Sequence, residues 1–485
     1  MTSKEDEETR ATGLKARLAR AHPALSRWVL PAAILCFLAW SFISLRSDFS
    51  WDDADPEVLN QAWRLAGGES IYRGIDSPPY SFAAYPPLYF ALTAVLLKLT
   101  GLSFLPARIL SLLAALAIGL ALVRLNREWN GDTWSGIWTT CFLFLMPAFL
   151  YNSTRSNVQM TAVALSLWSF VFFLRSSYKE SVVISPLLAV LALYTKQTQA
   201  ALPLAAILYL AFRKRRLLIP YAATLAAAGL VPFLWLQRIT DGHFFLNVFR
   251  FANLDYSVLQ IPGIFLHHAG PMLPFIGFAL WTSWRRFRSN SGEPLDFYMG
   301  CVLPATLVSL GRVGAHGQYV LELLVVSMLC LLRVTRLPAM RGREILASVQ
   351  ILILLVYTPL FIVLEEGLWD ISANRAAGEI YPLLAGTTGP ILSQQGSFAL
   401  FARGAIYIQL FHFTALSRAV LWELNLLLRE IKSRRFPFVI TEFSIGSPEP
   451  CENARERFTP EMLMSLHANY RLFKVMHPYH VYVPR

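Results

Sequence analysis

Long apolar runs without charged residues dominate the pattern of hydrophobic and polar positions along the chain. Most of them lack the period of 2 or 3.6 residues that gives a soluble strand or helix one polar face. Runs of about 18 residues or more are typical of helices that cross a membrane. The sequence predicts a mainly α, polytopic membrane protein with about eleven spans, at residues 28–45, 105–124, 133–151, 157–174, 181–195, 198–212, 217–237, 269–284, 296–311, 319–333 and 344–365.

The composition of the chain supports this class. Its 485 residues are 55% hydrophobic and only 15% charged, whereas an ordinary soluble domain carries about 25% charged residues. These values exclude a soluble enzyme and a disordered chain. The five cysteines show no pairing pattern and no spacing typical of metal ligands, so a disulfide scaffold is excluded as well.

In a soluble protein the net charge of +12 would suggest a nucleic-acid partner. In a membrane protein the same cations can instead set the orientation of the chain, and their positions distinguish the two. With the N-terminus in the cytoplasm, the cytoplasmic segments hold 21 Lys and Arg residues and the opposite loops hold nine. This excess agrees with the positive-inside rule. The charge is therefore interpreted as an orientation signal in the cell inner membrane, and no nucleic acid is expected to bind.

One apolar stretch, Pro86–Thr100, does not fit this alternation. It has only 15 residues and begins with a Pro-Pro pair, and counting it as a span would remove the charge bias. A re-entrant or interfacial helix is the better interpretation. The first outer loop then covers residues 46–104, and it holds seven acids, Asp48, Asp52, Asp53, Asp55, Glu57, Glu69 and Asp76.

The segment after the last span differs in composition, which predicts two domains, residues 1–366 in the membrane and an extracytoplasmic α/β domain at 367–485. Thr459-Pro460-Glu461 is a helix start with Pro at the first helical position. Phe413–Lys432 has helical periodicity. Residues 437–443 and 478–483 are rich in β-branched and aromatic residues, which favours strands.

The strongest candidate for chemistry is the acidic sequence Trp51-Asp52-Asp53-Ala54-Asp55, directly after the first span. A carboxylate beside an apolar cavity can act as a general base, and Asp52 and Asp53 are the catalytic candidates. The simpler interpretation is a solvated cluster in which Asp55 caps a helix, with the following Pro at the first helical position. Both interpretations remain open at this point.

Four cations near the predicted outer membrane face are candidates for a functional role, Arg108, Lys196, Arg250 and Arg312. The alternative for each is a side chain that extends to the membrane surface. Lys196 lies in a short hairpin and Arg108 begins a span, which makes them the better candidates. Glu322 lies within a span and needs a partner, for which Arg312 or His316 are the candidates.

The order of these motifs resembles the polyprenyl-phosphate-sugar-dependent glycosyltransferases of the GT-C fold. Protein O-mannosyltransferases and the bacterial aminoarabinose transferase are the nearest in pattern. The resemblance covers nearly the whole chain. It rests on the acid pair after the first span, Ala62-Trp63-Arg64-Leu65-Ala66-Gly67-Gly68, Tyr85-Pro86-Pro87-Leu88-Tyr89, Ala107-Arg108-Ile109-Leu110-Ser111 and the outer α/β segment.

The resemblance implies an enzyme that takes a sugar from a polyprenyl phosphate and passes it to an acceptor lipid, glycan or protein. The donor phosphate then needs charge-assisted hydrogen-bond donors, and the candidates are Arg108, Lys196, Arg250 and Arg312. Asp52 matches the catalytic acid of the first loop, with Asp53 second. Asn157 stands where the family often has a second acid, and an amide binds a divalent ion poorly, so no metal or other cofactor is expected. Substrate-binding candidates are Tyr85, which stands where a Lys is expected, and Asn157, His243, His316, Tyr319 and Glu322.

Two other functions remain open on the sequence. A transporter or lipid flippase without transferase activity also suits eleven spans and buried cations, although no internal repeat is visible. A ligase that moves an assembled glycan from a lipid diphosphate is the second. The sugar, the acceptor, the oligomeric state and the role of residues 367–485 are not determined by the sequence.

Overall fold

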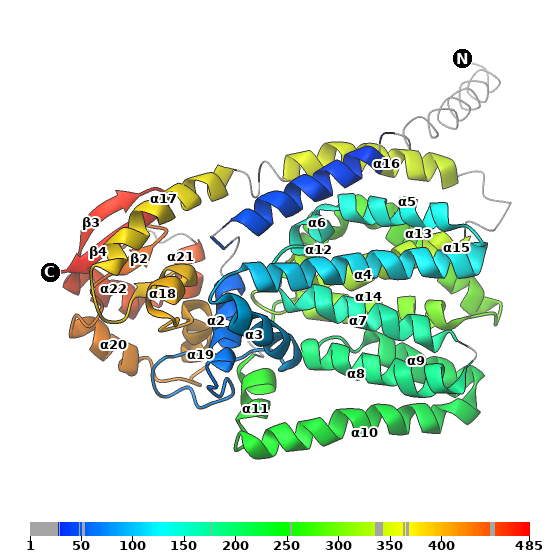
Figure 1. The fold of residues 1–485 in the computed structure, drawn as a ribbon, viewed down its shortest axis with the longest axis horizontal. Coiled ribbons are helices and arrows are strands. Elements are labelled where there is room, and N and C mark those ends of the chain that lie inside the picture. Colours follow the sequence, from blue (N-terminus) through cyan, green and yellow to red (C-terminus); the bar gives the residue numbers. More distant parts are fainter. Residues whose placement is uncertain are drawn as a thin grey trace.

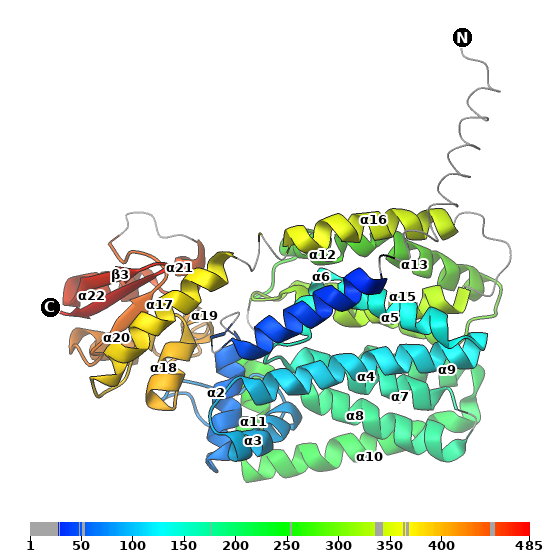
Figure 2. The same ribbon diagram turned by 45° about the horizontal axis from the view of Figure 1, so that its top comes forward.

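The computed structural model describes residues 28, 30–47, 49–50, 54–175, 177–252, 255–334, 343–361, 364, 368–446 and 452–485. These residues form a mainly helical protein. A bundle of long helices occupies one end, and a small sheet with its own helices occupies the other (Figure 1). The segment that follows the first helix lies between the two ends, as the second view also shows (Figure 2).

The bundle contains the predicted spans as helices, most with boundaries shifted by a few residues. Its elements are Leu30–Arg46, α4 (Leu105–Asn130), α5 (Thr133–Leu145), α6 (Pro147–Asn152), α7 (Val158–Phe173), η1 (Lys179–Ile184), α8 (Ser185–Thr195), α9 (Ala201–Arg213), α10 (Arg215–Ile239), α12 (Gln260–Ala269), η3 (Gly270–Met272), α13 (Leu273–Arg288), α14 (Pro294–Leu310), η4 (Gly317–Val320), α15 (Leu321–Val334) and α16 (Arg343–Phe361).

Among the described residues, three helical segments are long and apolar enough to cross a membrane by length and composition. They are Leu105–Asn130, Arg215–Ile239 and Gln260–Arg288. The total of eleven spans stays a prediction. The predicted span 133–151 is two helices, because Pro147 begins α6 and leaves Met146 extended, with φ −67° and ψ 129°.

The first outer loop folds into α2 (Ala54–Ala66) and α3 (Leu88–Thr100). At 1.5 Å per residue α3 is about 20 Å long, which is short of the roughly 30 Å hydrocarbon core of a bilayer. The interpretation of Asp55 as a helix cap is wrong, because α2 already includes Ala54. The Asp55 carboxylate is instead buried, 3.6 Å from the guanidinium of Arg155.

The strands β1 (Leu392–Ser393), β2 (Val439–Thr441), β3 (Tyr470–Met476) and β4 (Tyr479–Pro484) form one sheet in the order β1-β2-β4-β3. Within this sheet, as far as the structure describes it, β1 and β2 pair in parallel and the other two pairs are antiparallel. The accompanying helices are α17 (Leu368–Ala385), α18 (Gly396–Arg403), α19 (Leu410–Arg418), α20 (Asn425–Lys432), α21 (Glu452–Arg457) and α22 (Pro460–Asn469).

Three of the local predictions for this segment are confirmed. β2 and β4 lie at the predicted strands, and the Thr459 side chain caps α22 by accepting a hydrogen bond from the Met462 amide. The segment Phe413–Lys432, whose periodicity is helical, does not form one continuous helix. It is split into α19 and α20, and Val420 between them has a φ of 57°, which a helix does not allow.

Backbone hydrogen bonds join this C-terminal segment to the first outer loop. The Tyr80 amide donates to the Tyr407 carbonyl at 2.7 Å, and the Gln409 amide donates to the Tyr80 carbonyl at 3.1 Å. The Ile406 amide donates to the Asn60 side chain of α2 at 3.0 Å. These bonds fix the start of α19 against the segment that leads into the bundle.

Within the bundle, α4 and α5 touch backbone to backbone at Gly136. A Cβ atom on Gly136 would lie 2.8 Å from the Val123 Cα atom, and backbone cannot move aside as a side chain can. We expect Gly136→Ala to lower the free energy of unfolding by about 1–3 kcal/mol, because overpacking forces the two helices apart. Thermal unfolding of the purified protein in detergent measures this effect.

Gly300→Ala in α14 is the matched control, since a Cβ atom there meets nothing within 4 Å. Its unfolding midpoint should equal or exceed that of the unsubstituted protein, because Ala favours a helix over Gly. Equal midpoints for Gly136→Ala and Gly300→Ala would contradict the close packing of α4 and α5.

Candidate functional site

A cavity of about 620 Å³ lies where the bundle, the first outer loop and the C-terminal segment meet. Most of its lining comes from loops and helix ends rather than from the middle of the bundle helices. The lining residues are Phe49, Ser50, Ala54, Glu57, Ala84, Tyr85, Lys196, Gln197, Thr198, Ala252, Gln260, Ile264, Arg312–Ala315, His316, Gln318, Tyr319, Ala373, Gln395, Phe411, His412, Glu442, Glu456 and Arg457.

Lys196 lies in the connection between α8 and α9, and its side chain is fully buried. The ammonium nitrogen lies 3.8 Å from the centre of the Tyr319 ring and 5.8 Å from that of Tyr85. Within the part of the chain that the structure describes, no hydrogen-bond acceptor contacts this nitrogen. Two aromatic faces therefore provide its local stabilisation, which suits a cation but leaves its three donor hydrogens available to a ligand.

Burial and, to a smaller extent, the nearby positive charge of Arg312 together lower the pKa of Lys196 to about 7. Both effects disfavour the charged form, because the ammonium loses water and faces a like charge. An anion placed between Lys196 and Arg312 would oppose both effects, because a nearby negative charge favours the charged form of each cation. This wall of the cavity is accordingly suited to an anionic group with several acceptor oxygens.

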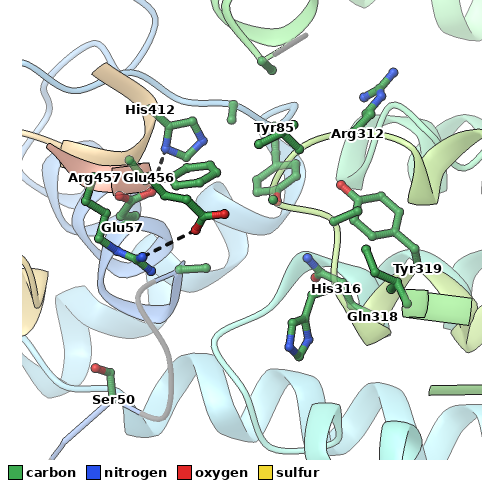
Figure 3. Close-up of a pocket in the computed structure, with 18 of the residues that line it drawn as sticks. Ser50, Glu57, Tyr85, Arg312, His316, Gln318, Tyr319, His412, Glu456 and Arg457 are labelled. Carbon is green, nitrogen blue, oxygen red and sulfur yellow. Dashed lines mark ion pairs between the residues drawn. The ribbon is translucent and has the colours of Figure 1, made fainter. Parts of the chain in front are cut away.

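The loop after α14 carries the remaining groups of this wall, namely Arg312, His316, Gln318 and Tyr319 (Figure 3). Gln260 holds the loop by donating to the carbonyls of Leu310 and Arg312 at 2.8 and 2.6 Å. Gln318 accepts a hydrogen bond of 2.6 Å from the Asn157 amide.

Gly314 in the same loop has a φ of +79°, and a Cβ atom there would lie 2.8 Å from the Phe411 ring of α19. Only glycine permits both this backbone conformation and this close approach. The loop and α19 therefore meet across one side of the cavity, which places the next residue of α19, His412, at the cavity wall.

The opposite wall carries carboxylates. Figure 3 shows Glu57, His412, Glu456 and Arg457 on one side and Arg312, His316, Gln318 and Tyr319 on the other. The His412 Nδ1 atom lies 3.1 Å from a Glu57 carboxylate oxygen, and Arg457 lies 3.7 Å from Glu456. The cavity is thus polarised, with cations on one wall and mostly acids on the other.

Asp52 and Asp53, the predicted catalytic acids, lie outside the described residues. Ser50 and Ala54, which flank residues 51–53 in the chain, both line the cavity. The Ser50 hydroxyl also accepts a 2.9 Å hydrogen bond from Ser397.

Of the other predicted residues, five line the cavity: Tyr85, Lys196, Arg312, His316 and Tyr319. Five do not: Arg108, Asn157, Arg250, His243 and Glu322. Arg250 is exposed on η2 (Leu246–Phe251), and His243 begins α11 (His243–Phe245), beside Gly74. Asn157 caps α7 and reaches the cavity only through Gln318.

The Arg108 guanidinium donates to three backbone carbonyls at the end of the first helix, those of Ser44 (2.7 Å), Ser47 and Phe49 (2.6 Å). It is therefore engaged in holding the chain that leads to residues 51–53. Glu322 accepts a 2.6 Å hydrogen bond from Tyr298. The partner of Glu322 seen in the structure is therefore Tyr298, whereas the candidates from the sequence are Arg312 and His316.

Sequence reasoning missed Glu57, Gln318 and His412 as parts of one site. Glu57 is one of the seven acids of the first outer loop, so the sequence indicated only weakly that it belongs to a site. His412 carried none, because it is more than 350 positions away in the chain and no local pattern joins it to Glu57. Among the described residues, no group of three or more His, Cys, Asp or Glu side chains is arranged to hold a metal ion.

Comparisons with known proteins agree with this architecture. The family model described as dolichyl-phosphate-mannose-protein mannosyltransferase matches residues 84–236. No curated protein sequence matches the chain.

Among solved structures, ArnT from Cupriavidus metallidurans bound to undecaprenyl phosphate has 14% identity and a TM-score of 0.62, covering 94% of this chain and 98% of that one. Its apo state gives 14% identity and a TM-score of 0.61, with coverages of 95% and 98%. At this identity the likeness shows the fold. The predicted resemblance to glycosyltransferases of the GT-C fold is therefore confirmed, in the family match and in the fold of nearly the whole chain.

Proposed function

We propose that the chain transfers a sugar from a polyprenyl-phosphate donor to an acceptor, in the cavity between the bundle and the C-terminal segment. The fold and the family match support a glycosyltransferase in general terms. The proposal adds the donor, which is the class of lipid phosphate found in the ArnT structure.

The observation that carries the proposal is the buried ammonium of Lys196. A buried charge is unfavourable unless it is paired, and Lys196 has aromatic rings beside it and another cation, Arg312, nearby. A lipid phosphate supplies the missing negative charge and the hydrogen-bond acceptors. It becomes the leaving group of the reaction, so cations at this position stabilise the charge that develops as the sugar departs.

The reaction joins an acceptor oxygen or nitrogen to the anomeric carbon of the sugar. The bond from that carbon to the phosphate oxygen breaks, and its electron pair stays with the phosphate. The proton of the acceptor passes to a general base, for which Asp52 is the first candidate and Asp53 the second. The lining of the cavity by Ser50 and Ala54 on either side of this sequence supports that assignment.

We further propose that the cavity opens on the extracytoplasmic face of the cell inner membrane, with the N-terminus in the cytoplasm. The distribution of Lys and Arg supports this orientation. The donor lipid and the acceptor then meet at the outer surface of the bilayer.

Mass spectrometry of envelope glycolipids and glycoproteins, with and without the gene for this chain, tests the function. The expected result is the loss of one sugar from a defined acceptor, together with accumulation of its lipid-linked form. If every glycolipid and glycoprotein is unchanged, the transferase function is wrong and a transporter becomes the better explanation.

We expect Asp52→Asn to abolish sugar transfer while the protein still inserts into the membrane, because the amide cannot take the proton of the acceptor. Sugar transfer in isolated membranes supplied with lipid-linked sugars measures this. Asp76→Asn, an exposed acid of the same loop, is the control and should keep full activity. Full activity of Asp52→Asn would show that another group is the base.

We expect the affinity for undecaprenyl phosphate to depend on the protonation of Lys196. Because its pKa is lowered to about 7, the ammonium is charged below that pH and loses its charge above it. Binding by the native protein, relative to Lys196→Arg, should therefore weaken as the pH rises from about 6 to about 8, since Arg stays charged throughout.

The measured quantity is the ratio of the affinity of the native protein to that of Lys196→Arg, with undecaprenyl phosphate as the ligand and both proteins in lipid nanodiscs. Taking the ratio at each pH cancels the titration of the phosphate itself. A ratio that does not change with pH would exclude Lys196 as the phosphate ligand.

A further inference from the structure

The acidic wall of the cavity lies opposite the wall that is proposed to hold the donor phosphate. Glu57 comes from α2, Glu442 follows β2 and Glu456 comes from α21, so three separate elements bring carboxylates to one side. Arg457 on the same wall lies 3.7 Å from Glu456, but the three carboxylates outnumber this one guanidinium, so the wall repels a phosphate and the opposite wall is favoured for the donor. The acidic wall is therefore available to the second substrate.

The centre of this wall is the pair of Glu57 and His412, whose side chains are only 17% and 21% exposed. The rings of Phe82 and Phe411 pack edge to face against the imidazole, at 5.2 and 5.5 Å between centres. These contacts leave the imidazole little freedom to rotate. Its position is set by the packing as well as by the carboxylate.

The Glu57 carboxylate lies 3.1 Å from Nδ1 without the geometry of a hydrogen bond, and its negative charge favours the neutral tautomer that carries its proton on Nδ1. Nε2 of that tautomer has a free lone pair and accepts a hydrogen bond. A hydroxyl group is a suitable donor for it. A phosphate monoester is not, because its oxygens are acceptors and its charge is repelled by the neighbouring carboxylates.

We propose that the acidic wall is the acceptor subsite, and that it takes an uncharged hydroxyl group rather than a phosphate. His412 binds that hydroxyl through Nε2, and Glu57 orients His412. This inference rests on the proposed transferase function. The hydroxyl oxygen forms the new bond to the anomeric carbon, and the carbon–oxygen bond to the lipid phosphate breaks with its electron pair on the phosphate. The hydroxyl carries one proton, so it turns from Nε2 of His412 toward the general base, Asp52 or Asp53, which takes that proton as the new bond forms.

The chemical linkage of the transferred sugar tests the acceptor class. The envelope component that loses a sugar when the gene is deleted is isolated from both strains and compared by mass spectrometry and phosphorus NMR. A glycosidic carbon–oxygen–carbon bond is the expected result. A sugar attached through phosphate, or through nitrogen, would overturn the inference while leaving the transferase function intact. No sugar change in any component would overturn both.

Kinetics test the role of His412 with two probes extracted from the deletion strain, the under-glycosylated acceptor and the lipid-linked sugar that accumulates. His412→Gln should raise the KM for the acceptor about 10-fold, the effect of losing one hydrogen bond, with the KM for the donor unchanged. Glu57→Gln should change the acceptor KM in the same direction. His467→Gln, an exposed residue of α22, is the matched control.

A purely structural role for His412 would change both KM values together or lower the unfolding midpoint relative to His467→Gln. Either result, or an unchanged acceptor KM in both His412→Gln and Glu57→Gln, would overturn the assignment of this pair to the acceptor. Should His412→Gln fail to fold, Glu57→Gln, which keeps the shape of the side chain, decides the question alone.

Discussion

A positive charge buried away from water is unfavourable unless something compensates it, and the geometry of this site is organised around such a charge at Lys196. The connection between α8 and α9 places the ammonium against the Tyr319 ring, and Arg312 adds a second cation to the same wall. Gln197 ties this connection to the first outer loop and to η2, by donating to the carbonyls of Ala84 (3.0 Å) and Val248 (3.1 Å). The cation is thus held in place before any ligand arrives.

The remaining parts of the fold serve to place other groups opposite this charge. Arg108 fixes the chain after the first helix, and the Asn60 and Tyr80 hydrogen bonds fix the start of α19. The result is a cavity with a cationic wall built mainly from the bundle and an acidic wall built mainly from α2 and the C-terminal segment. Such a division suits a reaction in which a neutral acceptor attacks one carbon from one side while an anionic leaving group departs on the other side.

Much of the helical architecture could be predicted from the sequence, because each apolar run carries its own signal of length and composition. The runs that give α4, α7 and α10 are examples. Finer features depend on tertiary contacts and were mispredicted. Strand β3 was missed since Arg471 and Lys474 interrupt its apolar pattern, and it is mostly exposed along its length.

The candidate site shows the same division. Lys196 and Arg312 could be found because a cation beside an apolar run is unusual. Arg108 looks the same in the sequence, yet the structure engages it with backbone carbonyls, which no local pattern distinguishes. The pairing of Glu57 with His412 depends on the closure of the C-terminal segment over the first loop, and only the folded chain shows it.

The most direct test of the central claim is an experimental structure of the protein in lipid nanodiscs with undecaprenyl phosphate bound. The account predicts the phosphate inside the cavity, with an oxygen about 2.7–3.2 Å from the Lys196 ammonium nitrogen and Arg312 beside it. A phosphate bound outside this cavity, for example at the exposed Arg250, with Lys196 still without an anionic contact, would contradict it.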